Sequence, residues 1–309
     1  MDFSTNYTLR TDLADEVLEG LYGKKGVADD GISFESTKPY GVNVDLVHVK
    51  NMWASRKTGK PAGRYVTVET GEIWKKDSAE FEKVSRALAG EIAKMLPERG
   101  LCLVVCLGNG RISADALGPM TANNLIVTRH IKTQDEKLFD TLGLGECACV
   151  VPGVMGDTGA EAAEIVSGVC EKLRPSSVIA VDALACRKLS RLARTVQISD
   201  TGISPGSGVG NDRAEISKRT LGVPTVAVGV PTVVEAATLT MDILERALGD
   251  KDEVYEFVQS RLSQNPCGFF VSPKETDKII KSMARLVGYS INLAIHGELS
   301  VSEMDEFLA

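Results

Sequence analysis

Three uninterrupted apolar runs set the strongest limit on how this chain can fold. They cover residues 101–107 (LCLVVCL), 177–181 (SVIAV) and 225–230 (TVAVGV). A strand with one face in solvent alternates apolar and polar residues, whereas a strand of a parallel sheet is buried on both faces and reads as a continuous apolar run. The runs therefore predict an α/β fold with a mostly parallel central sheet flanked by helices.

Amphipathic segments around these runs supply the expected helices. Residues 77–96 and 158–173 carry apolar side chains at helical spacing, and the second opens with a capping box, TGAE. A last helix is predicted over residues 272–297, with SPKE as its start and proline at the first helical position. Near the N-terminus, residues 41–49 and 64–70 read as short strands of an extension to the sheet.

The composition excludes several classes of protein. The 309 residues carry a formal charge of −7, which argues against a large nucleic-acid surface. No apolar stretch approaches the roughly 18 residues of a membrane span, and the first residues lack the apolar core of a signal peptide. The seven cysteines form no C-x-x-C pair and the three histidines have no zinc-site spacing. We expect a protein inside the cell, in a reducing compartment, with no membrane or nucleic-acid partner.

Two aspartates occupy matching places relative to the apolar runs. Asp182 follows the run at 177–181 directly, and Asp115 lies on the loop after the run at 101–107. Because ligands bind outside the carboxyl ends of parallel strands, both side chains are expected to face one crevice if these strands are neighbours. Two carboxyl groups that close can share one proton and act as an acid and a base. The alternative is that each aspartate only caps a helix.

Glycine-rich loops offer a second set of candidate site residues. Gly108, Asn109 and Gly110 follow a strand but lack the rest of a dinucleotide-binding fingerprint. Residues 199–211 (SDTGISPGSGVGN) present amides that can hold an anion or a peptide backbone, or form a surface turn. On the sequence alone, a phosphate-binding module without catalytic activity remains an alternative, and Asp157 and Asp200 are reserve candidates for the carboxyl pair.

Several sequence blocks, in order along nearly the whole chain, resemble the germination protease family: YTLRTDLADE, GNGRISADALGP, NNLIVTRH, PGVMGDTGAE, AVDALACR, QISDTGISPGSGVGN, LGVPTVAVGVPTVVEA and VSPKETD. The resemblance implies an endopeptidase of the spore core that degrades small acid-soluble spore proteins at germination. It also implies a zymogen, a homotetramer, no cofactor, and a phosphorylase/hydrolase-like fold shared with hydrogenase-maturation endopeptidases. Residues 249–266 form a short charged connection where other members carry an insertion.

The resemblance also implies roles for individual residues. Asp115 and Asp182 match the two aspartates of an atypical aspartic-type pair. In the hydrogenase-maturation relatives the equivalent positions bind nickel, so a metal-dependent endopeptidase with His130 as a third ligand is the main alternative. The family cuts after an acidic residue that precedes a hydrophobic residue and alanine. The expected contacts to such a substrate come from backbone groups at Asn109, Gly206, Gly208 and Gly210 and from a basic side chain, Arg129, Arg187 or Arg213.

The N-terminal sequence contains a copy of such a cleavage motif. Residues 11–16 read TDLADE, so Asp12, Leu13 and Ala14 supply the acidic, hydrophobic and alanine positions. We predict self-cleavage between Asp12 and Leu13. This divides the chain into a propeptide, 1–12, and one α/β peptidase domain, 13–309, in which 13–76 form a peripheral extension of strands and loops. The alternative is a chain terminus that leads into a helix at Leu13.

Overall fold

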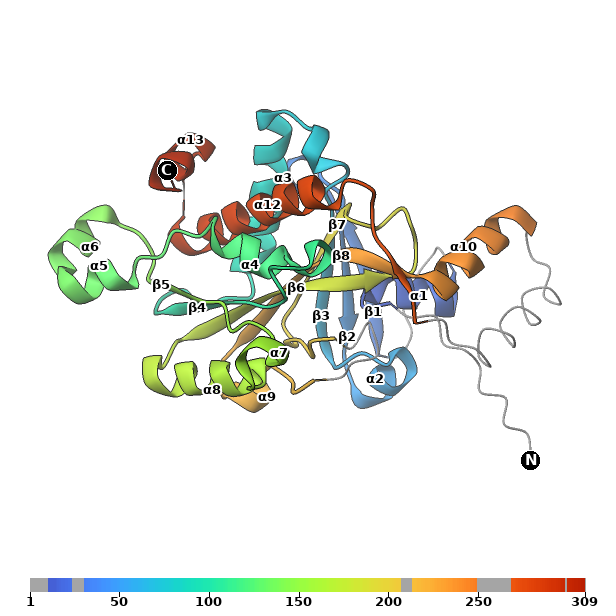
Figure 1. The fold of residues 1–309 in the computed structure, drawn as a ribbon, viewed down its shortest axis with the longest axis horizontal. Coiled ribbons are helices and arrows are strands. Elements are labelled where there is room, and N and C mark those ends of the chain that lie inside the picture. The colour runs from blue at the N-terminus through green and yellow to red at the C-terminus, as the bar shows by residue number, and fades with distance from the viewer. Residues whose placement is uncertain (1–10, 24–30, 207–212, 249–267, 298, 309) are drawn as a thin grey trace.

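One mixed β-sheet with helices on both faces forms the frame of the protein (Figure 1). The computed structural model describes residues 11–23, 31–206, 213–248, 268–297 and 299–308. The strand order is β1-β2-β3-β7-β8-β6-β4-β5, and β9 pairs with β8. The strands are β1 (Ile32–Thr37), β2 (Val44–Val49), β3 (Gly63–Glu69), β4 (Cys102–Cys106), β5 (Cys147–Val150), β6 (Ser177–Cys186), β7 (Thr195–Ser199), β8 (Thr225–Glu235) and β9 (Phe270–Val271).

Helices connect the strands and cover the sheet. They are α1 (Ala14–Tyr22), α2 (Met52–Thr58), α3 (Ser78–Ala93), α4 (Leu117–Ala122), α5 (Arg129–Gln134), α6 (Glu136–Leu142), α7 (Met155–Thr158), α8 (Ala162–Leu173), α9 (Lys218–Leu221), α10 (Ala236–Leu248), α12 (Thr276–His296) and α13 (Val301–Leu308). Short 3-10 turns are η1 (Pro39–Gly41), η2 (Ile73–Lys75) and η3 (Ser113–Asp115). In the described part of the chain, none of these helices has the length and apolar character needed to cross a membrane.

The prediction of a mostly parallel sheet is wrong in part. The pairs β8-β6, β6-β4 and β4-β5 are parallel, but β1, β2, β3, β7 and β8 pair antiparallel with one another in turn, and β9 is antiparallel to β8. The three apolar runs do form β4, β6 and β8, which are consecutive neighbours. Residues 187–194, which connect β6 to β7, are too few for a crossover helix, so β7 returns antiparallel. The α/β class is confirmed.

The two faces of the sheet are covered differently. On one face α3, α4 and α12 pack over β2, β3, β4, β6, β7 and β8, which makes the main core. Figure 1 shows these helices above the sheet and α8 below it. On the second face α8 packs against β4 and β6, while α1 and α2 pack against β1, β2 and β3. The apolar residues of that face thus fall into separate clusters.

Two of the predicted helix starts differ from the structure. The segment at 158 begins its long helix only at Ala162, because Thr158 ends α7 and the capping box forms between Glu161 and Glu164 instead. The last helix begins at Thr276 after a turn, and Glu275 is its N-cap. Its end before Gly297 is confirmed. The predicted helix at 77–96 is α3, which Asp77 caps by accepting from the N–H of Glu80.

A close contact between α4 and β4 yields a test of the fold. A Cβ atom on Gly118 would lie 2.1 Å from the carbonyl oxygen of Leu107, which is backbone and cannot turn away. We expect Gly118→Ala to lower the free energy of unfolding by about 1–3 kcal/mol through overpacking. Gly90→Ala is the matched control, because Gly90 is exposed on α3 with no atom within 4 Å of its Cβ position. Urea unfolding of both variants measures the difference; equal stability would contradict the contact.

Candidate active site

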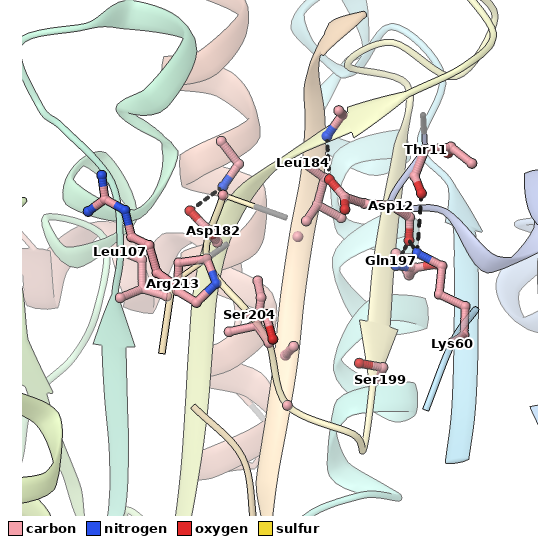
Figure 2. A pocket seen from close by; sticks show the side chains of 18 of the residues that line it. Thr11, Asp12, Lys60, Leu107, Asp182, Leu184, Gln197, Ser199, Ser204 and Arg213 are labelled. Atoms are coloured by element: carbon pink, nitrogen blue, oxygen red, sulfur yellow. Dashed lines mark hydrogen bonds between the residues drawn. The ribbon is translucent and has the colours of Figure 1, made fainter. Parts of the chain in front are cut away.

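On the second face of the sheet, side chains of β6, β7 and β8 line an open cavity. Register pairs align Asp182 with Gly229 and Gly229 with Gln197, so these residues lie in one row across three strands. Strand residues alternate between faces. Val178 and Ala180 pack under α8, so Asp182 points to the same side. A cavity of about 1960 Å³ opens here and is lined by Asp115, Asp182 and Gln197 among others. Figure 2 shows Asp182 and Gln197 in it.

A tight turn after β4 positions Asp115. The backbone N–H of Asn109 donates to Asp115 Oδ2 at 2.8 Å. Gly108 has φ +110°, and a Cβ there would lie 2.1 Å from the Asp115 carbonyl oxygen, so this turn requires glycine. Asp115 does not cap α4, whose N-cap is Ala116 without a side-chain cap bond. The half-buried carboxyl group is thus oriented by its own loop and faces the cavity.

Asp182 lies within β6, four residues before the strand ends at Cys186, and not just past the strand as predicted. The difference arises because β6 continues beyond the end of its neighbour β4 at Cys106. Asp182 is buried, with 6 % of its surface exposed. Its Oδ1 accepts from the N–H of Ala183 at 2.9 Å. It is therefore no helix cap. Its backbone sits in the sheet while its carboxyl group enters the cavity.

The negative charge of Asp115 affects the protonation of Asp182. Burial raises the pKa of Asp182 to about 8, and the negative charge of Asp115 is the second cause. Burial also raises the pKa of Asp115, although its bond from Asn109 and the charge of Arg213 act in the opposite direction. Asp182 consequently holds a proton at neutral pH beside a carboxyl group that ionises more readily. This is the arrangement of an acid and a base in one site.

The predicted loop contacts lie in different places. Gly206 lines the cavity, whereas Gly208 and Gly210 fall outside the described residues. Asn109 uses its backbone N–H to hold Asp115, and its side chain accepts from Arg111 N. In this structure the backbone N–H of Asn109 therefore serves the carboxyl pair.

The three candidate arginines are not equivalent. Arg213 lines the cavity, and its charge opposes the rise in pKa of both aspartates. Arg187 also lines the cavity, while its backbone N–H donates to Glu16 Oε2 at 2.7 Å. Arg129 begins α5 and is not among the described residues that line the cavity. Of the three candidates, Arg213 and Arg187 therefore line the cavity.

The reserve aspartates and the possible metal ligand lie elsewhere. Asp200 is paired with Arg64 at 2.8 Å, and Asp157 with Arg111 at 2.9 Å. Neither lines the cavity, and His130 does not line it either, as far as the described residues go. Within the parts of the chain that the structure covers, no three His, Cys, Asp or Glu side chains gather in a way that could hold a metal ion.

The N-terminal segment occupies the other end of the same cavity (Figure 2). The N–H of Asp12 donates to the Ala185 carbonyl at 2.9 Å, and the N–H of Ala185 donates to Asp12 Oδ2 at 2.8 Å. The Asp12 carbonyl oxygen accepts from Lys60 Nζ and from Gln197 Nε2, both at 3.0 Å. Sequence reasoning did not single out Lys60 or Gln197.

Each side chain after Asp12 has its own surroundings. Leu13 is fully buried in an apolar cluster with Leu184, Cys186, Leu192 and Val234. Asp15 is paired with Arg191 at 2.7 Å. Glu16 accepts from the backbone N–H groups of residues 187 and 188, at 2.7 and 2.9 Å. Helix α1 begins at Ala14, one residue after the helix start that the alternative expected, and Thr11 and Asp12 before it line the cavity.

Comparison with known proteins identifies the family of this chain. A family model described as germination protease matches residues 22–252. The germination protease of Clostridium perfringens is 38% identical over 98% of this chain and 99% of its own length. The germination protease of Caldanaerobacter subterraneus is 38% identical over 97% of this chain and 98% of its own length. That of Bacillus pumilus is 35% identical over 97% of this chain and 97% of its own length. The chain is therefore a peptidase, a class to which a carboxyl pair in an open cavity is suited. It belongs to the germination protease family.

The raised pKa of Asp182 predicts a pH dependence of stability. The folded protein keeps a proton on Asp182 up to about pH 8, whereas the unfolded chain releases it near the ordinary value of 3.8. Stability from this group is complete below the unfolded value and is lost as pH rises towards 8, at no more than about 1.4 kcal/mol per pH unit. We expect Asp182→Asn to flatten the fall in unfolding free energy across this range. Urea unfolding at a series of pH values measures it, and identical slopes in both proteins would contradict the assignment.

Proposed function

We propose that this protein is an endopeptidase of the spore core that begins the degradation of small acid-soluble spore proteins during germination. It cuts after an acidic residue that precedes a hydrophobic residue and alanine. The single observation that carries the proposed chemistry is the carboxyl pair: Asp115 and Asp182 share one cavity, and the charge of one raises the pKa of the other. Membership of the germination protease family supports the biological setting.

The proposed mechanism divides the work between the two carboxyl groups. Ionised Asp115 takes a proton from a water molecule, whose oxygen attacks the carbonyl carbon of the scissile peptide bond. Protonated Asp182 gives its proton to the amide nitrogen as the carbon–nitrogen bond breaks. The pKa of Asp182, about 8, suits this acid role at neutral pH. Arg213, whose charge favours the ionised form of both aspartates, is the proposed partner of the acidic substrate residue.

We propose further that the chain is made as a zymogen in which residues 1–12 are the propeptide and residues 13–309 the peptidase unit. Residues 11 and 12 line the cavity that contains the carboxyl pair, so they obstruct substrate entry there. Asp12 pairs with Ala185, three residues beyond Asp182 on β6 and so about 10 Å further along the strand. Cleavage of the Asp12–Leu13 bond therefore requires the segment to shift towards the carboxyl pair. The proposed assembly is a homotetramer, as the family resemblance implies.

Replacement of the carboxyl pair tests the proposed chemistry. We expect Asp115→Asn and Asp182→Asn each to lower kcat on a small acid-soluble spore protein by at least about 10²-fold, because each removes a proton-transfer group. Asp157→Asn is the control, since Asp157 is paired with Arg111 outside the cavity. The timed digest is followed by gel and mass spectrometry, with and without a chelator. Full activity in either cavity variant would remove that residue from the chemistry, and loss of wild-type activity with chelator would favour the metal-dependent alternative.

Self-cleavage has a distinct product. Incubated full-length protein should yield a species that begins at Leu13, and Asp115→Asn should not yield it, because the same carboxyl pair performs the reaction. Intact-mass spectrometry over time measures both. A wild-type chain that remains full length while it digests a spore protein would refute the propeptide and leave the peptidase activity standing.

A further inference from the structure

The side chain of Gln197 forms hydrogen bonds with the backbone of the N-terminal segment on both sides of Leu13. Its Nε2 donates to the carbonyl oxygen of Asp12 at 3.0 Å, and its Oε1 accepts from the N–H of Ala14 at 2.7 Å. One side-chain amide thus satisfies a carbonyl and an N–H of the same short peptide, much as a neighbouring strand would. This contact reads the backbone and does not depend on the side chain of the residue between.

Lys60, in the loop before β3, binds the same backbone segment. Its Nζ donates to the carbonyl oxygens of Thr11 and Asp12, at 3.2 and 3.0 Å. The Asp12 carbonyl oxygen therefore receives two donors, one of them from an amine. Burial lowers the pKa of Lys60, although the negative charges of Asp12 and Glu16 act against this. We call Lys60 and Gln197 the backbone clamp.

The surroundings of the backbone clamp select side chains in a fixed order. The carboxyl group of Asp12 accepts from the N–H of Ala185, and Leu13 fills an apolar cluster that includes Leu184. Ala14 is 2 % exposed and packs among apolar residues of α1, α2 and the first strands, where little room remains for a longer side chain. The seat thus fits an acidic residue, a hydrophobic residue and alanine in turn.

The backbone clamp lies on the same face as the carboxyl pair. Gln197 and Asp182 flank Gly229, which has no side chain, in one row across β7, β8 and β6. Both line the same cavity (Figure 2). The Gln197 backbone therefore lies two strand spacings, about 10 Å, from the Asp182 backbone. A polypeptide held by Gln197 lies on the same face of the sheet as the carboxyl pair, and it must shift towards the pair before a peptide bond is cut, as the Asp12–Leu13 bond must.

We infer that Lys60 and Gln197 are positioning residues that seat the cleavage motif of protein substrates by its backbone, in the place that residues 11–14 of the chain occupy here. The inference rests on the proposed function. It requires residues 11–14 to leave the backbone clamp before a second polypeptide enters. The N-terminal segment is then a competitor that uses the contacts of the substrate.

Cleavage of a peptide in trans separates this role from a structural one. The substrate is a synthetic peptide with the sequence of residues 7–20, and the enzymes are the full-length wild type, Lys60→Met, Gln197→Met and, as control, Lys83→Met. Lys83 is exposed on α3 and paired with Glu80. If Lys60 and Gln197 only tied down the N-terminal segment, their loss would free the cavity and leave cleavage unchanged or faster. The backbone clamp predicts the opposite sign: a KM at least about tenfold higher, with the control unchanged.

A second peptide tests the backbone contact itself. It carries N-methylalanine at the position of Ala14, which removes the N–H that Gln197 Oε1 accepts. Wild-type protein should have a kcat/KM about tenfold lower on this peptide than on the unmethylated one. Gln197→Met should have the same kcat/KM on both peptides, because it already lacks the acceptor. Steric effects of the methyl group cancel in this comparison because they are common to both enzymes.

The outcomes distinguish the inference from the proposed function. Higher KM values together with a methylation penalty confined to wild type support the backbone clamp. Variants as fast as wild type, or an equal penalty in both proteins, overturn it and leave the peptidase intact. A wild type that cleaves neither itself nor the peptide nor a spore protein overturns both. Urea unfolding checks each variant, and if Lys60→Met does not fold, Gln197→Glu decides, since it keeps the acceptor for Ala14 and loses the donor to Asp12.

Discussion

The burial of Asp182 in a cavity that also holds the carboxyl group of Asp115 is the constraint on which the site depends. Adjacent parallel strands β4 and β6 bring Asp115 and Asp182 into one cavity, and burial makes the simultaneous ionisation of both costly. The sheet supplies the rigidity that keeps them together, because β6 is hydrogen-bonded on both sides up to Val181. The charge of Arg213 favours the ionised form of both aspartates, and the Asn109 amide favours it in Asp115 alone.

Much of this frame could be predicted from the sequence. Continuous apolar runs identify strands buried on both faces, and the three runs are neighbours in the sheet. Because Asp115 and Asp182 each follow one of these runs, the sequence predicted that the two aspartates would face one crevice if the strands were neighbours. The antiparallel half could not be read in the same way, since strand direction depends on connection geometry. Thr158 illustrates a second limit: a capping-box pattern fits several registers, and tertiary packing selected the box at Glu161.

The backbone clamp escaped the sequence analysis for a physical reason. Gln197 is a polar residue in the strand TVQIS, between Val196 and Ile198, which face the main core. That alternation indicates a polar position on the opposite face, but it does not reveal what lies there. Lys60 sits in a loop whose composition carries no signal at all. Their common partner, Asp12, is 48 residues from Lys60 and 185 residues from Gln197 along the chain, and only the folded sheet brings it within reach.

Gly229 is a residue without a side chain on the wall of the cavity, between Asp182 and Gln197. A Cβ atom there would lie 2.5 Å from Leu184 Cδ1 and Cγ, so the Leu184 side chain already rests on the spot that any larger residue would claim. Leu184 also belongs to the apolar cluster around Leu13. A methyl group at Gly229 would therefore displace the Leu184 side chain, which lines the cavity together with Asp182 and Asp12. Glycine at position 229 thus keeps the cavity continuous between the carboxyl pair and the N-terminal segment.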